Sequence, residues 1–358
     1  MRTNHNYYLN LAFEIAKTNL GKTKLNPAVG SIVVKNNFVV SSGVTSLNGR
    51  PHAEFNALKK NINFRGANLY TTLEPCTHFG LTPPCVNIII KKKIKKVFYA
   101  FNDPDVRTFK KAKNILLKKK IKLKLIKSKY YKNFYDSYYF NKKFNQPFIS
   151  AKIAISKDYY TINKRSKWIT SKHSKKITHY LRSESDCIFS TSKTINKDNS
   201  LLNCRIEGLN KFKPDLFIID LNLKLKKNLS LNKLLSKRST FLLTKKENKK
   251  KVLFFKKKGF KIIFIKSLNS EKDFRNIFKR IYKMGYCRAF FETGLTFLNS
   301  LLSFKLLNNL YVLQNDKLLK NNGSNNSTLK FLKKLKLTKK IKINLYNDSL
   351  YKKEFKYV

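Results

Sequence analysis

The sequence predicts an α/β protein built from two domains. Its 358 residues exceed one typical domain, because about 150 residues per domain is the common prior. Runs rich in β-branched and aromatic residues alternate with stretches of helical spacing, which is the order of an α/β fold. Gln146-Pro147 interrupts this order. We therefore expect a domain boundary there, with domains at 1–145 and 146–358.

The first domain opens with a predicted amphipathic helix. Apolar residues recur at helical spacing within residues 1–20, and Glu14 lies among them, so this segment does not have the character of a signal peptide. The elements expected after it are a hairpin with strands at 29–34 and 38–41, helix 51–60, strand 67–73, helix 84–93, strand 96–101, and a helix and a strand between 110 and 129. Residues 130–145 are aromatic without clear periodicity, and no element is predicted for them.

The second domain repeats the alternation of strands and helices. The expected strands are 148–155, 186–190, 216–220, 240–244, 261–265, 288–292 and 310–314, and the expected helices are 174–182 and 271–284. No internal repeat is detectable. No apolar run in the chain approaches the ~20 residues of a membrane span.

The charge of the chain is far from that of an average globular protein. Lys and Arg number 77 against 20 Asp and Glu, for a formal net charge of +57. Such a field attracts nucleic acids and anionic membranes whatever the fold. The chain is also rich in Lys and Asn and poor in Gly, a bias typical of AT-rich codons. We therefore interpret most of the charge as drift on solvated surfaces, and expect no specific nucleic-acid partner and no membrane partner.

Three residues form a candidate zinc site. His52 opens the segment Pro51–Leu58, and Cys76 and Cys85 follow the next predicted strand. One imidazole and two thiolates leave a fourth tetrahedral position for water, as a catalytic zinc requires. Each ligand is expected at or near a helix start, where the helix dipole favours a thiolate. The alternative is that His52 caps a helix and both cysteines are ordinary buried thiols.

Glu54 is the candidate catalytic residue. It lies two residues after His52, so its carboxylate can stay off the metal and still move protons between the attacking water and a leaving amino group. A His/Cys/Cys zinc site with a non-ligand Glu is the pattern of zinc deaminases. Five cysteines without a secretory segment indicate a reducing, cytoplasmic setting.

The motifs around these residues identify a family. NPAVG at 26–30, PHAEFNAL at 51–58 and TLEPCTHFGLTPPC at 72–85 resemble the bifunctional deaminase–reductase of riboflavin biosynthesis. The gap of eight residues between the cysteines separates this family from nucleoside and nucleic-acid deaminases. The resemblance implies a cytidine-deaminase-like α/β/α sandwich followed by a dihydrofolate-reductase-like α/β domain.

The resemblance also implies two reactions. The first domain would hydrolyse an amino group of a diaminopyrimidinone that carries a phosphoribosylamino group, and the second would reduce the ribose to ribityl with NADPH. The implied cofactors are Zn²⁺ and NADPH. The implied partner is a small phosphorylated pyrimidine substrate, and a homo-oligomer stays open.

The resemblance assigns further site residues. In the first domain Asn26 and His78 match residues that bind the substrate. In the second domain the matching substrate residues are Trp168, Arg182, Arg205 and Glu292, and the matching cofactor residues are Ala154, Thr170, Thr194, Asp198 and Gly294. Structural roles stay open beside these: a turn for Asn26, core packing for Trp168, and a solvated surface for the two arginines.

The chain departs from the family at positions that bear on both reactions. Leu81 replaces a Lys or Arg and Thr45 replaces a His, and both lost side chains would suit a substrate phosphate. Tyr159, Asn199 and Ser200 replace family residues of the second domain. Two alternatives therefore stay open: a deaminase whose reductase domain has decayed, and a deaminase of tRNA or other nucleic-acid bases.

Overall fold

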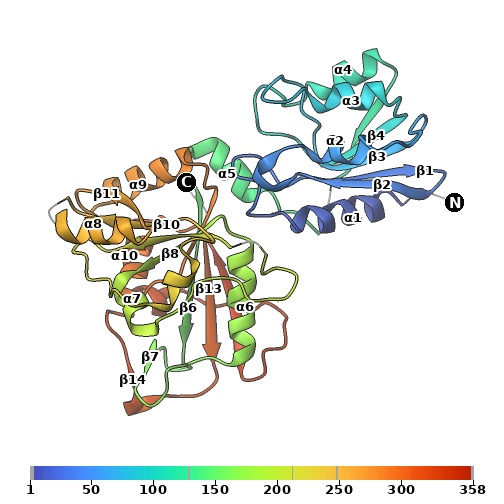
Figure 1. The fold of residues 1–358 in the computed structure, drawn as a ribbon. Coiled ribbons are helices and arrows are strands. Elements are labelled where there is room, and N and C mark those ends of the chain that lie inside the picture. The colour runs from blue at the N-terminus through green and yellow to red at the C-terminus, as the bar shows by residue number, and fades with distance from the viewer. Residues whose placement is uncertain (1–3, 128–129, 212, 247–248, 356–358) are drawn as a thin grey trace. The chain divides into compact units, whose positions relative to one another are not determined.

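The chain divides into two compact units, Met1–Asn145 and Gln146–Val358. The computed structural model describes residues 4–127, 130–211, 213–246 and 249–355 (Figure 1). Both units are α/β structures, so the predicted fold class is confirmed. Within the described ranges, no helix combines the length and the apolar character needed to cross a membrane.

The first unit is built on a five-stranded mixed sheet in the order β2-β1-β3-β4-β5. The strands are β1 Gly30–Lys35, β2 Phe38–Val44, β3 Asn68–Leu73, β4 Lys96–Phe101 and β5 Lys122–Leu125. Strand β1 is antiparallel to β2 and β3, while β3, β4 and β5 are parallel. The parallel strands carry their following loops to one edge of the sheet, and that edge carries the candidate site.

Helices cover both faces of this sheet. The helices are α1 His5–Lys17, α2 Ala53–Leu58, α3 Cys85–Lys91, α4 Ala112–Lys118 and α5 Asp136–Phe144. The apolar face of α1 packs with Tyr135 and Tyr138 against one side of the sheet, and α2, α3 and α4 pack against the other. The unit is therefore an α/β/α sandwich.

Helix α5 lies where no element was predicted from the sequence. Its buried residues are Ser137, Tyr138 and Asn141, and none of them is aliphatic. The tyrosine hydroxyls of this helix are hydrogen-bonded: Tyr138 donates to Asp103 and Tyr139 donates to the carbonyl of Asn102. A side chain with an apolar ring and a polar tip weakens the contrast on which periodicity depends. The helix was missed for that reason.

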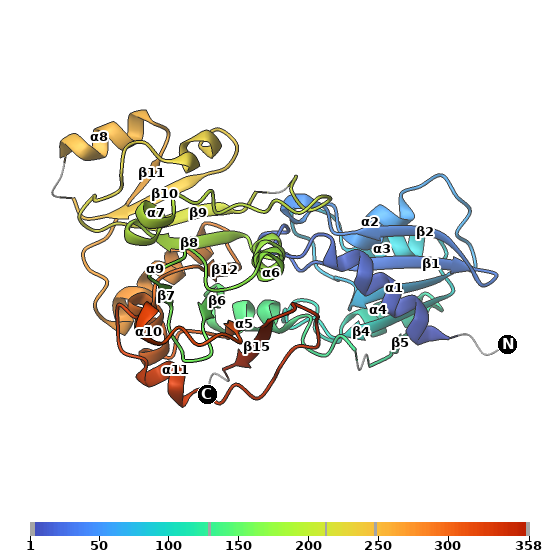
Figure 2. The same ribbon diagram turned by 90° about the horizontal axis from the view of Figure 1, so that it is seen from below.

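The second unit is built on an eight-stranded sheet in the order β11-β10-β9-β8-β12-β6-β13-β15, which Figure 2 shows from below. The strands are β6 Phe148–Ile155, β8 Cys187–Thr191, β9 Asp215–Ile219, β10 Thr240–Thr244, β11 Lys261–Phe264, β12 Arg288–Phe291, β13 Asn309–Asn315 and β15 Asp348–Glu354. Neighbours are parallel except β13 and β15. A small hairpin joins β7 Ile162–Asn163 to β14 Gly323–Ser324.

Two apolar layers enclose this larger sheet. One contains α9 Glu271–Lys283 and α10 Leu295–Ser303, and the other contains α7 Ser192–Asp198 and α8 Lys249–Lys257. Helix α6 Lys172–Ser183 and the short α11 Lys330–Lys334 complete the helices described here. The sequence predicted α6 and α9 but not the shorter helices, nor β15, whose Lys352 and Lys353 hide its strand character.

Candidate metal and active site

The three candidate ligands come from two helix starts and one loop. His52 is the N-cap residue of α2, and Cys85 is the first residue of α3. Cys76 lies in the loop after β3, so it is not at a helix start along the chain, whereas His52 and Cys85 are. The Cys76 sulfur nevertheless accepts the backbone N–H of Cys85 at 3.2 Å, so the start of α3 does stabilise negative charge on Cys76.

The ligand atoms are spaced for one tetrahedral metal ion. The Nδ1 atom of His52 lies 3.6 Å from the Cys76 sulfur and 3.4 Å from the Cys85 sulfur. All three ligand atoms lie within 4.8 Å of one another. Zinc bonds of about 2.0–2.3 Å at tetrahedral angles separate nitrogen and sulfur ligands by roughly 3.6 Å. The donor set and its spacing therefore fit zinc.

Glu54 lies in the first turn of α2 with its carboxylate buried beside the sulfurs. Its side chain is 4% exposed, and its Oε2 atom accepts a hydrogen bond from the Cys85 thiol at 3.3 Å. Burial, together with the charge of Cys76, raises the pKa of Glu54 to about 7. A carboxyl group that exchanges its proton near neutral pH is suited to general acid–base work.

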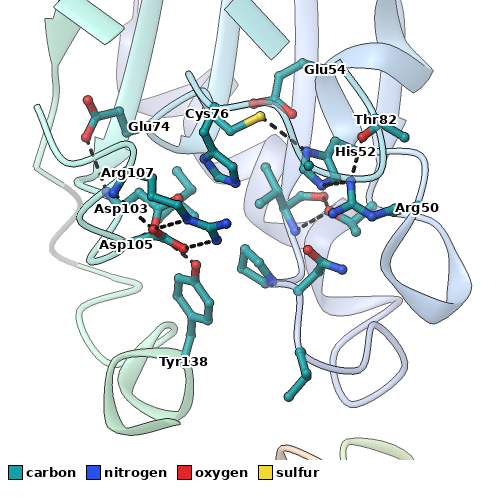
Figure 3. A pocket seen from close by; sticks show the side chains of 18 of the residues that line it. Arg50, His52, Glu54, Glu74, Cys76, Thr82, Asp103, Asp105, Arg107 and Tyr138 are labelled. Atoms are coloured by element: carbon teal, nitrogen blue, oxygen red, sulfur yellow. Dashed lines mark hydrogen bonds and ion pairs between the residues drawn. The ribbon is translucent and has the colours of Figure 1, made fainter. Parts of the chain in front are cut away.

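His52, Cys76 and Glu54 line a pocket together with both substrate residues predicted for the first unit (Figure 3). Asn26 lies against the turn at Gly49, whose φ of +91° and close packing exclude a side chain: a Cβ there would lie 2.4 Å from the Asn26 Nδ2 atom. The Nδ1 atom of His78 lies 3.1 Å from the Thr108 hydroxyl. The pocket thus joins loops from distant parts of the unit.

Several pocket residues were not predicted from the sequence. Polar side chains that line the pocket beside the predicted ones are Arg50, Glu74, Asp103, Asp105, Arg107, Tyr138 and Lys142. Two of them had a usable signal: Arg50 adjoins the Pro51-His52 motif, and Asp103 ends a strand. Lys142 had none, because it belongs to the helix that was missed.

Asp105 organises one wall of this pocket. It accepts hydrogen bonds from Arg107 at 2.6 Å and from Lys142 at 2.9 Å. The Arg107 guanidinium, with Lys142 beside it, holds the pKa of Asp105 well below its usual value. The charges of Arg107 and Lys142 are therefore directed at this carboxylate.

A buried ion pair dominates the predicted site of the second unit. Arg182 on α6 donates to Glu292, which follows β12, through Nε at 2.5 Å and Nη2 at 2.9 Å. Its Nη1 atom donates to the carbonyl of Asn203 at 2.9 Å, so all three guanidinium nitrogens are engaged. Arg205 donates to the Asn203 side chain at 3.0 Å. Of the two predicted phosphate arginines, Arg205 has more of its guanidinium available.

A lysine that the sequence analysis did not assign lies close to this pair. Lys152 is on β6, and burial lowers its pKa, while the charge of Glu292 acts in the opposite direction. Asp198, the last residue of α7, also acts on Lys152, and burial raises the pKa of Asp198. Lys152, Asp198 and Glu292 thus form one polar cluster with Arg182.

Three of the remaining predicted cofactor residues lie at or near the carboxyl ends of neighbouring parallel strands. Ala154 is on β6, and Thr194 is in α7 directly after β8. Gly294 is the N-cap of α10 after β12, and the space that a Cβ would enter there is open. Thr170 directly precedes the N-cap of α6. Open space at the start of α10, at this edge of the sheet, fits a phosphate of a cofactor such as NADPH.

Trp168 lies on the surface of the second unit. It is 52% exposed, and the Lys175 ammonium lies 3.6 Å from the centre of its ring. It is therefore not a core residue, and the core-packing alternative is wrong. Its role toward the substrate stays a prediction.

Comparisons with known proteins cover both units. A family model for the cytidine and deoxycytidylate deaminase zinc-binding region matches residues 2–101, and a model for the RibD C-terminal domain matches residues 147–343. Riboflavin biosynthesis protein RibD of Aquifex aeolicus is 34% identical over 300 residues, 82% of each chain. Its counterpart in Buchnera aphidicola is 39% identical over 209 residues, 56% of this chain and 55% of the other.

Two solved structures share the fold of the whole chain. RibD of Acinetobacter baumannii matches with a TM-score of 0.81 at 23% identity, covering 97% of this chain and 98% of the other. The Thermotoga maritima diaminohydroxyphosphoribosylaminopyrimidine deaminase/5-amino-6-(5-phosphoribosylamino)uracil reductase matches with a TM-score of 0.79 at 23% identity, covering 97% of each. The expected pair of folds, deaminase-like then reductase-like, is confirmed.

Proposed function

The chain belongs to the RibD family of bifunctional riboflavin-biosynthesis enzymes, and on that premise we propose how its residues divide the two reactions. Residues 1–145 form the zinc-dependent deaminase, and residues 146–358 form the NADPH-dependent reductase. The deaminase converts a diaminopyrimidinone bearing a phosphoribosylamino group into the corresponding uracil, with release of ammonia. The reductase then converts the ribose of that product into a ribityl chain.

The arrangement of His52, Cys76, Cys85 and Glu54 at one site carries the deaminase half of the proposal. The first three residues hold zinc, since their donor atoms have the types and the spacing that it needs. Zinc, when bound, acts as a Lewis acid that makes a water molecule more acidic. The chain's own contribution is to fix the ligands on two helix starts and one loop and to hold Glu54 beside them.

Glu54 moves the protons of the deamination. Its carboxylate takes a proton from the attacking water as the new carbon–oxygen bond forms, and it then protonates the amino group, which leaves as ammonia when the carbon–nitrogen bond breaks. A pKa of about 7 allows the same group to accept and to donate a proton. Asn26, on the pocket wall, offers an amide that can accept and donate hydrogen bonds to the pyrimidine edge.

The polar cluster of the second unit serves the reduction. NADPH, when bound, supplies the two electrons for reduction of the ribose. Gly294, at the start of α10, and Thr194, in α7 directly after β8, would hold the phosphates of NADPH. Ala154, Thr170 and Asp198 are the other residues that we assign to the NADPH site. Trp168, Arg205, Glu292 and Arg182 form the site for the sugar phosphate: Arg205 has donors available for the phosphate, and the Arg182–Glu292 pair fixes the orientation of both side chains.

The proposal has a direct test in solution. The full chain, supplied with the diaminopyrimidinone phosphate, should release ammonia without NADPH and should oxidise NADPH, in preference to NADH, only after deamination. Ammonia release without NADPH oxidation would identify a deaminase with a decayed reductase domain. Deamination of a defined RNA at physiological salt would instead support the nucleic-acid alternative.

We also propose that the enzyme works in a reducing compartment. No disulfide joins the cysteines in the part of the chain that the structure describes, which suits a reducing compartment such as the cytoplasm. The substrate is a small phosphorylated pyrimidine, and a homo-oligomer stays compatible with the fold.

A further inference from the structure

Arg50 places a positive charge inside the deaminase pocket, and neither reaction described above uses it. It lies two residues before His52 and lines the pocket beside the metal ligands. Its Nη1 atom donates to the Thr82 hydroxyl at 2.6 Å, and a Cβ on Gly80 would lie 3.4 Å from its Nη2 atom. The guanidinium is thus held against the loop that joins the two cysteines. Figure 3 shows it on the side of the pocket opposite Arg107.

The charge of Arg50 has no acidic partner among the residues that the structure describes. The other two cations that line the pocket, Arg107 and Lys142, both form ion pairs with Asp105. The neutral hydroxyl of Thr82 accepts only one of the five N–H groups of Arg50. Burying part of a guanidinium without a carboxylate partner costs free energy, unless a ligand accepts its hydrogen bonds and neutralises its charge.

The contact of Arg50 with His52 gives the guanidinium no acceptor. Arg50 Nη1 lies 3.4 Å from the Nε2 atom of His52, whose Nδ1 atom faces the two sulfurs. When Nδ1 is a metal ligand, Nε2 carries the proton of the neutral ring, so both atoms of the Arg50 contact are donors. His52 therefore cannot satisfy the guanidinium in the loaded site.

We propose that Arg50 binds the phosphate of the pyrimidine substrate and sets the deaminase's preference for the phosphorylated form. This inference rests on the proposed deaminase function. A guanidinium donates two parallel hydrogen bonds to a phosphate, and an unpaired one already fixed on a pocket wall loses little entropy on binding.

The two positions that depart from the family cannot take this role. Leu81 is apolar and 89% exposed. Thr45 is 1% exposed, and its hydroxyl is bonded to the backbone of Val29, so it is not free for a ligand. Of Arg50, Arg107 and Lys142, only Arg50 forms no ion pair with a carboxylate of the described residues.

The test compares phosphorylated and dephosphorylated substrate. Ammonia release is measured for the wild type, Arg50→Met, Arg50→Lys and the control Arg65→Met, which removes an exposed arginine of the same unit outside the pocket. Arg50→Met should lower kcat/KM for the phosphorylated substrate by about 10- to 100-fold, mainly through KM, because charge-assisted hydrogen bonds are lost. The dephosphorylated substrate should change by less than about 3-fold, Arg50→Lys should be intermediate, and Arg65→Met should match the wild type.

Zinc content separates this role from a structural one. Arg50→Met should keep the zinc of the wild type, because Arg50 is not a ligand. Equal losses on both substrates, or a wild type that does not discriminate between them, would overturn the inference and leave the deaminase function standing. A wild type that deaminates neither substrate would overturn the proposed function itself.

Discussion

Replacing Glu292 by Gln should destabilise the second unit by about 3 kcal/mol. The Arg182 and Glu292 side chains are 9% and 12% exposed, and two hydrogen bonds of 2.5 and 2.9 Å join them. Removing one partner of a buried pair typically costs ~3–5 kcal/mol, because the other charge stays buried and uncompensated. Gln still accepts one hydrogen bond from Arg182, so we expect the lower end of that range.

The measurement uses the only tryptophan of the chain. Trp168 lies in the second unit, so its fluorescence during denaturant unfolding of the full chain reports on that unit. Glu271→Gln is the matched control, because Glu271 pairs with Arg275 at 2.6 Å while both side chains are 37–49% exposed. That control should lose only about 0.2–1 kcal/mol.

A double variant separates the ion pair from simple packing. Arg182→Met combined with Glu292→Met removes both charges, and it should be more stable than either single variant because neither member of the pair is left without its partner. If Glu292→Gln costs no more than the exposed control, the pair is solvated and the reasoning from burial is refuted.

Further predictions concern the metal and pH. Cys85→Ser should lower zinc content well below about one ion per chain and abolish ammonia release, because the site loses one of three protein ligands; full zinc in that variant would exclude Cys85 as a ligand. Burial, with Arg182 and Arg205 nearby, lowers the pKa of His179 to about 4, so the folded chain favours the neutral imidazole. The stability that this shift contributes is fully present above the unfolded pKa of 6.5 and is lost as pH falls from 6.5 towards 4. His179→Gln should therefore lose less stability between pH 7 and 5 than the wild type, and an equal loss in both proteins would contradict that pKa.

Much of the candidate deaminase site could be predicted because its signals are local. The metal-binding residue types, the proline-rich turns and the strand before them all fall within short segments, and the strands β1 to β4 have plain β-rich runs. Arg50 adjoins the motif at 51–58, but neither its contacts nor those of Asp105 could be predicted from the sequence. What these two residues do depends on which charges the fold brings beside them, and periodicity carries no such information.

The second unit was less predictable for a related reason. Most of its strands are plain β-rich runs and were predicted. Helix α7 is too short to show helical spacing, and lysines dilute the apolar character of α8, so these two helices were not predicted. Lys152 resembled any other lysine of a chain with 77 Lys and Arg residues. Only the parallel order of β6, β12 and β8 brings it to Glu292 and Asp198.

The most direct test of the account follows both reactions in the variant Glu54→Gln. The amide keeps the shape of the side chain and cannot shuttle a proton, so ammonia release from the diaminopyrimidinone phosphate should fall by ~10²–10⁴-fold while zinc content is unchanged. The same variant, supplied with the deaminated product, should oxidise NADPH at the wild-type rate, because Glu54 belongs to the other unit. Near wild-type deamination by Glu54→Gln, or no NADPH oxidation on the deaminated product by the wild type, would contradict the account.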